Sequence, residues 1–334
     1  MPHIAIDEPK PFDLIVPASL SEAIELGDRY GTTGAYLAGG CDLMDQLKHQ
    51  MRTSQKVINL KGLRELQGVS ETPLLLRLGA LVTLAEIGRR EEIRQKLPAL
   101  AHAATRVATP QIRNAATIGG NLLQDSRCAY YRGGFHCYRA GGIVCDARRG
   151  INEEHALFGG DRCYTVSPSD LAPAIVALNG HVSIVSSEGE RWLPAAHLFA
   201  SPGQNVRAMH HVRSGEILTA IEIPIVPDQH STFIKYGMRN AWDFALASIA
   251  VSLRVERGRC RDCRIVLGAV AAVPWRSRAA EQAVEGHTLV NSVIEEASNQ
   301  ATDGATSLSH NSYKLGLIRK LVRAAFRELA NGVV

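Results

Sequence analysis

The chain has 334 residues, of which 46% are hydrophobic, and this length predicts about two domains whose cores need no disulfides for stability. Its formal net charge of +4 is small and its basic residues are spread along the sequence, so the composition does not favour a nucleic-acid-binding protein. No apolar run approaches the roughly 20 residues that cross a bilayer, and the first residues show no secretory leader. The number of cysteines, seven, is odd. Together these three features favour a cytoplasmic protein with reduced thiols.

The first third of the chain predicts short strands that alternate with helices. Residues 13–16 are apolar and β-branched, which predicts a strand. Ser19 and Glu22 then form a capping box at the start of an amphipathic helix that ends near Tyr30. The same patterns predict strands at 35–38, 56–60 and 74–78, and helices that begin near Asp42, Thr83 and Pro98.

Two glycine-containing turns interrupt these elements. The strand at 35–38 gives way at Gly39 and Gly40 to a helix start, where backbone N–H groups lack partners within the helix. Glycine lets the chain turn there and lets a pyrophosphate approach the backbone closely. The spacing is not the G-x-G-x-x-G of a Rossmann unit, so this turn predicts either a phosphate site or a plain tight turn. A second turn, residues 117–121 (Thr-Ile-Gly-Gly-Asn), follows the helix-breaking Pro110.

Four cysteines follow the second turn within 36 residues: Cys128, Cys137, Cys145 and Cys163. Four thiolates can hold a [4Fe–4S] cube, and wide spacings are acceptable when a loop folds around the cluster. Residues 125–166 carry six arginines against five acids, which would offset the negative charge of such a cluster. We favour the cluster because a Cys₄ zinc site usually has tighter paired spacing, with zinc and incidental cysteines as the alternatives.

The second half of the chain predicts mainly antiparallel strands, followed by helices. Cys260 and Cys263 form a C-x-x-C within one strand pattern, which we interpret as hairpin packing, with redox or metal chemistry as the alternative. The sequence around Pro227 predicts a domain boundary. The predicted strands cover 216–225, 231–238, 244–256 and 261–273, and helices follow beyond Arg278, the longest over 311–329.

Four ordered motifs resemble a known family. Residues 38–44 read Ala-Gly-Gly-Cys-Asp-Leu-Met, 116–122 read Ala-Thr-Ile-Gly-Gly-Asn-Leu, 169–173 read Ser-Asp-Leu-Ala-Pro, and 216–218 read Glu-Ile-Leu. In order and spacing they are similar to the FAD-binding medium subunit of the molybdenum hydroxylase or xanthine dehydrogenase family, which includes carbon monoxide dehydrogenase and aldehyde oxidoreductases. The cysteine segment makes the chain most similar to the β subunit of 4-hydroxybenzoyl-CoA reductase, which carries a [4Fe–4S] loop there, as do some periplasmic aldehyde oxidoreductases.

The sequence departs from the family in two places. Residue 41 is Cys where the family more often has a small hydroxyl residue, and 17 residues separate Cys145 from Cys163. The resemblance implies an α+β fold with a two-subdomain FAD-binding domain of the p-cresol methylhydroxylase or vanillyl-alcohol oxidase type at 1–226. It further implies an iron–sulfur insert at about 125–166 and a C-terminal domain of antiparallel sheet and helices at 227–334.

The resemblance also implies a set of site residues, none of them catalytic. Asp170 could instead merely cap the next helix, and Lys235 could be a solvated strand residue. The four cysteines named above are the implied cluster ligands. The implied FAD-binding residues are Leu37, Ala38, Gly39, Gly40, Cys41, Asp42, Leu43, Ala80, Ala108, Ala116, Thr117, Gly120, Asn121, Leu123, Asp170, Leu218 and Lys235.

By resemblance, the protein is an electron-transfer subunit with FAD and a [4Fe–4S] cluster. Its implied partners are a large molybdopterin-binding subunit, a small subunit with two [2Fe–2S] clusters, and a soluble carrier such as ferredoxin. In a reductase of the 4-hydroxybenzoyl-CoA type electrons flow inward, whereas in the alternative, an aldehyde or xanthine dehydrogenase type, they flow outward. Two further alternatives are a stand-alone flavin dehydrogenase and a zinc-stapled interaction or nucleic-acid module.

Overall fold

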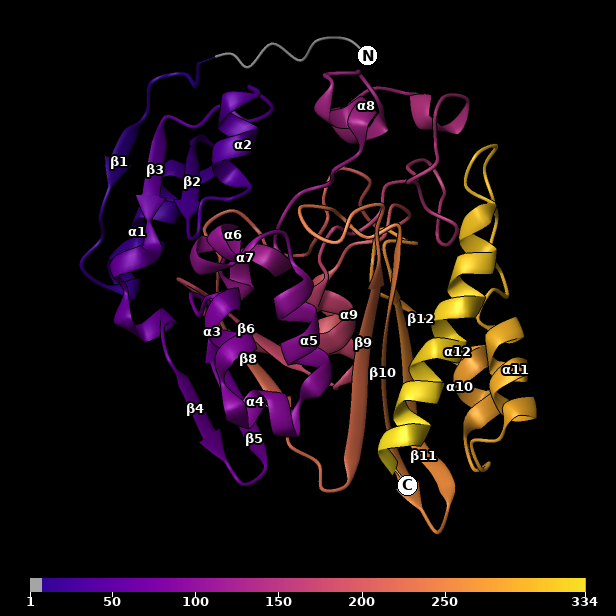
Figure 1. The fold of residues 1–334 in the computed structure, drawn as a ribbon. Coiled ribbons are helices and arrows are strands. Elements are labelled where there is room, and N and C mark those ends of the chain that lie inside the picture. The colour runs from indigo at the N-terminus through magenta and orange to yellow at the C-terminus, as the bar shows by residue number, and fades with distance from the viewer. Residues whose placement is uncertain (1–7, 334) are drawn as a thin grey trace.

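The computed structural model describes residues 8–333, which form three sheets with helices packed around them (Figure 1). The first sheet is parallel, in the order β1-β3-β2, and the other two are antiparallel, in the orders β4-β5-β8-β6-β7 and β12-β11-β10-β9. The strands are β1 (Asp13–Ile15), β2 (Gly34–Leu37), β3 (Lys56–Asn59), β4 (Val69–Thr72), β5 (Leu75–Gly79), β6 (His181–Ser186), β7 (Gly189–Pro194), β8 (Ile217–Pro224), β9 (Gln229–Tyr236), β10 (Ala247–Glu256), β11 (Arg259–Gly268) and β12 (Trp275–Arg276).

The parallel sheet is covered by the first helix, α1 (Leu20–Tyr30). Ser19 Oγ accepts a hydrogen bond from Glu22 N at 3.2 Å, and the Glu22 carboxylate accepts one from Ala18 N at 2.6 Å. The predicted cap at Ser19 is therefore confirmed, and the glutamate reaches back one residue further than in the usual capping box. The apolar face of α1, including Ala23 and Leu26, is buried in the same cluster as Ile58 of β3.

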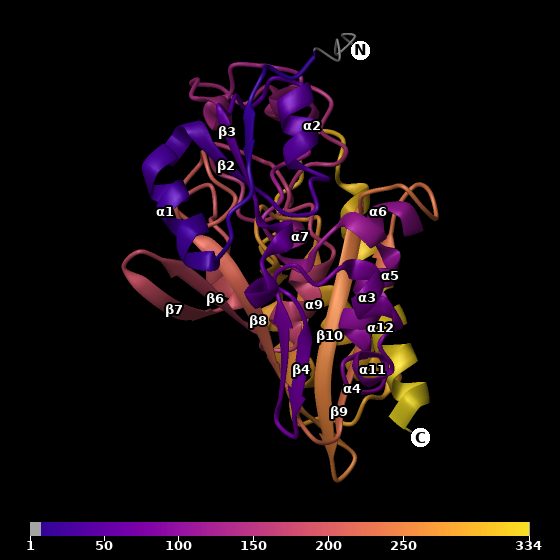
Figure 2. The same ribbon diagram turned by 90° about the vertical axis from the view of Figure 1, so that its left-hand side faces the viewer.

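The third sheet is covered on both faces. Alternate residues of a strand point to opposite faces, so Ile249 and Val251 of β10 pack into a core with the C-terminal helices, while Ala250 packs into the core around α5 (Pro98–Arg106) and α9 (Leu171–Ala177). Figure 2 shows β6 and β7, which end the second sheet, on the left of the view. The remaining helices are α2 (Leu43–Lys48), α3 (Leu84–Arg89), α4 (Glu91–Lys96), α6 (Pro110–Ala115), α7 (Ile118–Leu122), α8 (Ala129–Arg132), α10 (Arg278–Val284), α11 (Asn291–Gln300) and α12 (Tyr313–Val333).

Residues 125–166, called the insert below, are mostly irregular and lie near α2 and the start of α12 (Figure 1). Arg132 of α8 donates to Asp42, which precedes α2, and to Asp45 within α2, which fixes one side of the insert to the first sheet region. On the other side, Phe158 stacks on Trp275 with ring centroids 4.8 Å apart and is buried in the core of the C-terminal helices. The insert thus joins both halves of the chain.

The predicted elements agree with the structure where their patterns are long. The helix predicted over 311–329 is α12, and the strand predicted over 244–256 is β10, which starts three residues later. The short edge strands β4 and β12 were not predicted. In the part of the chain that the structure describes, none of the helices combines the length and apolar character needed to span a bilayer.

Candidate functional site

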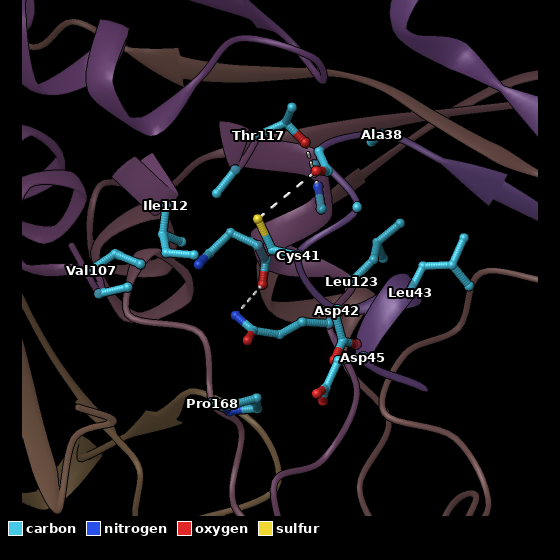
Figure 3. A pocket seen from close by; sticks show the side chains of 18 of the residues that line it. Ala38, Cys41, Asp42, Leu43, Asp45, Val107, Ile112, Thr117, Leu123 and Pro168 are labelled. Carbon is cyan, nitrogen blue, oxygen red and sulfur yellow. Dashed lines mark hydrogen bonds between the residues drawn. The ribbon is translucent and has the colours of Figure 1, made fainter. Parts of the chain in front are cut away.

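A cavity of about 580 Å³ lies where the two glycine turns meet (Figure 3). Its walls come from the turn between β2 and α2, the turn after β5, the start of α7, the first residues of β8 and the loop between β9 and β10. The volume is in the range of small-molecule and cofactor sites. Segments that are more than 100 residues apart in the sequence therefore enclose one space.

Most of the predicted cofactor residues line this cavity. Leu37 and Lys235 do not: Leu37 ends β2 just before the cavity, and Lys235 reaches it only through its hydrogen bonds. The predicted residues that line it are Ala38, Gly39, Gly40, Cys41, Asp42, Leu43, Ala80, Ala108, Ala116, Thr117, Gly120, Asn121, Leu123, Asp170 and Leu218.

Two glycines allow the walls to approach one another. A Cβ atom on Gly39 would lie 2.2 Å from the carbonyl oxygen of Ala115, and one on Gly119 would lie 2.9 Å from the Cβ of Ala80. Gly40 has a φ of +79°, a conformation that other residues rarely adopt. The sequence therefore needs glycine here to bring the β2–α2 turn against the α6–α7 turn.

Asn121 lies in the wall of the cavity. Its Oδ1 accepts a hydrogen bond from Ser169 Oγ at 2.6 Å, which fixes the orientation of the amide. Within residues 8–333 no acceptor lies in hydrogen-bonding reach of Asn121 Nδ2, although only 8% of the side chain is exposed. This donor is therefore available to a ligand in the cavity.

Asp170 and Lys235 form a buried ion pair at the edge of the cavity. Lys235 Nζ donates to Asp170 Oδ2 at 2.6 Å, to the carbonyl of Asp243 at 2.8 Å and to that of Arg106 at 3.3 Å. Lys235 is 7% exposed, so its interpretation as a solvated strand residue is wrong. Asp170 occupies the N-cap position of α9, but its side chain makes no capping hydrogen bond, and Ser169 Oγ accepts the one from Ala172 N.

The loop between β9 and β10 adds side chains that sequence reasoning missed. Trp242 is 60% exposed, has a φ of +55° and donates from its backbone N to the carbonyl of Ala108 at 3.2 Å. The guanidinium of Arg127 lies 5.1 Å from the ring centroid of Phe244. Nothing in the hairpin pattern indicated that this loop would reach a turn more than 100 residues earlier in the chain.

Cys41 lies in the middle of the cavity wall (Figure 3). Its Sγ is 3.9 Å from the carbonyl oxygen of Gly39, a weak contact, and partial burial raises the pKa of the thiol. A neutral thiol is a poor substitute for a hydroxyl as a hydrogen-bond donor. At this position the backbone, more than the side chain, is suited to contact a ligand.

The four insert cysteines line a second, much smaller cavity and are called the cysteine cage below. Burial raises the pKa of the Cys163 thiol to about 11, and burial followed by the neighbouring Cys137 and Cys145 raises that of Cys128. The cavity holds about 10 Å³, and within residues 8–333 no three metal-binding side chains are arranged around one ion. The structure therefore offers no single-ion site of the kind that tetrahedral zinc requires.

Cys260 and Cys263, by contrast, are buried in the core of the C-terminal helices. The hydrogen bond between Cys263 and Cys260 is the main cause that raises the pKa of Cys263, followed by burial. These two thiols lie in β11 and not at the cage. Their arrangement agrees with the interpretation as hairpin packing.

Asp125 connects the large cavity to the cysteine cage. Its backbone N donates to Asp42 Oδ2 at 2.7 Å, and its carboxylate accepts hydrogen bonds from Tyr131 and Arg139. Two residues further on, Arg127 lines the large cavity while the adjacent Cys128 lines the cage. Consecutive Cα atoms are about 3.8 Å apart, so the two sites share a wall.

The comparisons with known proteins cover both halves of the chain. Residues 10–226 match the family described as the FAD binding domain in molybdopterin dehydrogenase, and residues 232–329 match the CO dehydrogenase flavoprotein C-terminal domain. The aldehyde oxidoreductase FAD-binding subunit PaoB of Escherichia coli is 30% identical over 88% of this chain and 90% of its own length. The glyceraldehyde dehydrogenase medium chain of Sulfolobus acidocaldarius is 25% identical over 96% of this chain and 99% of its own length.

The solved structures add a similarity of fold. A chain of the carbon monoxide dehydrogenase from Hydrogenophaga pseudoflava superposes with a TM-score of 0.77 over 97% of this chain and 98% of that chain. The two sequences are 23% identical. A similarity at that level of sequence identity concerns the whole fold and does not identify the substrate.

Proposed function

Because the chain belongs to the family of FAD-binding medium subunits of molybdenum hydroxylases, we propose that it carries electrons away from an aldehyde-oxidising enzyme of that family. The observation that carries this proposal is the near full-length similarity to two subunits whose names both refer to aldehyde oxidation. The same observation favours the aldehyde or xanthine dehydrogenase alternative over the 4-hydroxybenzoyl-CoA reductase that the sequence predicts.

The large cavity fits FAD in its volume and its chemistry. The backbone at Gly39 and Gly119 leaves no room for side chains, which suits a turn that a pyrophosphate approaches closely. The unpartnered Nδ2 of Asn121 is a donor for a phosphate or flavin oxygen. Bound FAD supplies one- and two-electron chemistry. The chain itself binds and orients the cofactor, with Asp170 held at the cavity edge by Lys235 and the β9–β10 loop covering one side.

The proposed partners are a large molybdopterin-binding subunit, where the aldehyde reacts, and a small subunit with two [2Fe–2S] clusters. A carrier outside the complex takes up the electrons. No catalytic residue is assigned to this chain, because the family similarity concerns a subunit that conducts electrons. The division into domains at about residue 226 belongs to the same proposal.

Purification of the protein from its native host tests this function. We expect two further chains to co-elute, together with molybdenum, FAD and aldehyde-dependent reduction of an artificial electron acceptor. Removal of the large chain should abolish the activity while FAD stays bound to this subunit. Steady aldehyde turnover by the isolated chain would instead establish the stand-alone dehydrogenase.

We further propose that the cysteine cage holds a [4Fe–4S] cluster. Four thiols line one cavity, and two buried nitrogens beside it, His155 Nδ1 and Arg139 Nε, lack hydrogen-bond partners within residues 8–333. Four thiols are the donor set that a [4Fe–4S] cluster takes. The enclosed space has room for about one water molecule, so cluster binding requires the cage to widen and the four thiols to lose their protons.

Replacing Cys137 and Cys145 together with serine tests the cluster. We expect iron, sulfide and the broad visible absorption to disappear while FAD stays bound, because neither residue lines the large cavity. The Cys41→Ser variant is the control, since Cys41 lies outside the cage and should leave the iron content unchanged. Full iron retention by the double variant would rule out this ligand set.

A further inference from the structure

His155 contacts the cysteine cage directly. Its Nε2 lies 3.2 Å from Cys128 Sγ, and its side chain is buried at 7% exposure. A metal-bound thiolate can only accept a hydrogen bond, so Nε2 must be the ring nitrogen that carries the proton. The other ring nitrogen, Nδ1, is buried without a partner among the described residues. The imidazole therefore has one polar contact, and that contact is a predicted cluster ligand.

The segment around His155 is held in place by the start of α12. Asn311 Nδ2 donates to the carbonyls of His155 and Ala156 at 3.1 and 3.2 Å. Lys314 Nζ donates to the carbonyls of Glu154 and His155 at 2.9 and 3.2 Å. The start of α12 thus fixes the backbone of His155. Further bonds in this contact, called the insert–α12 contact below, join His310 N to Asn152 Oδ1, Asn152 Nδ2 to Ser309 Oγ and the Tyr313 hydroxyl to the carbonyl of Glu153.

Lys314 also brings a positive charge close to His155. Its side chain is 0% exposed, and no carboxylate among residues 8–333 forms an ion pair with it. Burial lowers the pKa of Lys314 to about 8, so the ammonium stays mostly protonated at pH 7. A buried unpaired cation is costly unless an anionic group lies nearby. Glu154 is one such group, since its charge raises the pKa of Lys314 against the effect of burial, and a thiolate-bound iron–sulfur cluster would be a second.

We infer that His155 is a positioning residue of the cysteine cage, which donates a hydrogen bond from Nε2 to Cys128 and is held in place by Asn311 and Lys314. The inference rests on the proposed cluster. Hydrogen bonds to cluster sulfur stabilise the more negative, reduced state and so raise the reduction potential. The positive charge of Lys314 acts in the same direction. The C-terminal helix thereby influences a redox centre in the insert.

Redox titration of purified protein, followed by electron paramagnetic resonance, tests this inference. The His155→Leu variant removes the donor, and we expect the cluster potential to become more negative. The His155→Gln variant retains an N–H donor and should stay closer to the wild-type potential. The FAD potential should not change in either variant. The His136→Leu variant is the matched control, because His136 is an exposed histidine of the insert and its loss should not move the potential.

The outcomes separate this inference from the cluster proposal. Wild-type protein without iron would refute the cluster and with it the role of His155. Iron retained in His155→Leu at an unchanged potential would refute the role of His155 alone. If His155→Leu does not fold, Lys314→Gln provides the test, since it keeps a donor for the carbonyls and removes the charge. A more negative potential in Lys314→Gln would support the inference, and an unchanged one would overturn it.

Discussion

Gly39 lies where a single added methyl group would collide with backbone. The doublet Gly39-Gly40 is visible in the sequence after a predicted strand, and a turn there could be foreseen from residue type alone. Its contact, the carbonyl of Ala115, lies 76 residues further on, and no local pattern indicates it. The glycines of the site could be predicted because a tight turn requires this residue type. Arg127 and Trp242 could not be predicted as site residues, because arginine and tryptophan side chains fit many surroundings.

A Gly39→Ala substitution should weaken FAD binding. The new Cβ would lie 2.2 Å from Ala115 O, so the two turns must separate. We expect the dissociation constant to rise on the order of tenfold or more, which corresponds to about 1.4 kcal/mol. Titration of the cofactor-free protein with FAD measures this dissociation constant. Gly62→Ala is the control, because a Cβ on Gly62 meets no atom within 4 Å. Equal losses in both variants would show that the close approach at Gly39 does not matter.

The elements that could be predicted are those with long regular patterns. Helix α12 has an apolar stripe over several turns, and the first seven residues of β10 are all apolar or serine because both faces of the strand are covered there. Strand β4, with the sequence Val-Ser-Glu-Thr, is mostly exposed at a sheet edge and has no apolar face to reveal it. The insert is held by side-chain contacts and has little regular structure, so periodicity gives no information about it.

Strand β9 carries one side chain that joins three other segments. Lys235 Nζ bonds to the last turn of α5, to Asp170 before α9 and to the loop after β9 itself. A Lys235→Met substitution would leave Asp170 buried and unpaired. We expect the free energy of unfolding to fall by about 3–5 kcal/mol.

Chemical denaturation measures this change. Lys56→Met is the matched control, because Lys56 pairs with Asp13 on the surface and an exposed pair contributes little. A loss in Lys235→Met no greater than in Lys56→Met would mean that the buried pair does not stabilise the fold.

At the scale of the whole molecule, the large cavity belongs to neither half of the chain alone. The glycine turns come from the first 121 residues, whereas Arg239, Trp242 and Phe244 come from beyond the predicted boundary at 226. The family motifs allowed the first set to be predicted residue by residue. The second set depends on how the third sheet packs against α5 and α9, and no local sequence pattern indicates that packing.

Trp242 provides a direct test of whether both halves of the chain form the cofactor cavity. Of the three tryptophans, it alone lines the large cavity, so a bound flavin should quench its emission. We expect the fluorescence decrease on FAD addition to be largely lost in Trp242→Phe. The decrease should persist in Trp192→Phe, since Trp192 lies on β7, away from the cavity. An unchanged decrease in Trp242→Phe would mean that the loop does not approach the cofactor.

The insert–α12 contact has a consequence for biosynthesis. Residues 152–156 obtain their hydrogen-bond partners from residues 309–314, which leave the ribosome about 150 residues later. Until then, the loop that carries His155 lacks its anchoring groups, and closing so long a loop costs entropy that only the finished helix offsets. Cofactor delivery to the insert is therefore expected to follow translation of the full chain, and a message truncated before codon 309 should yield a polypeptide that takes up no iron.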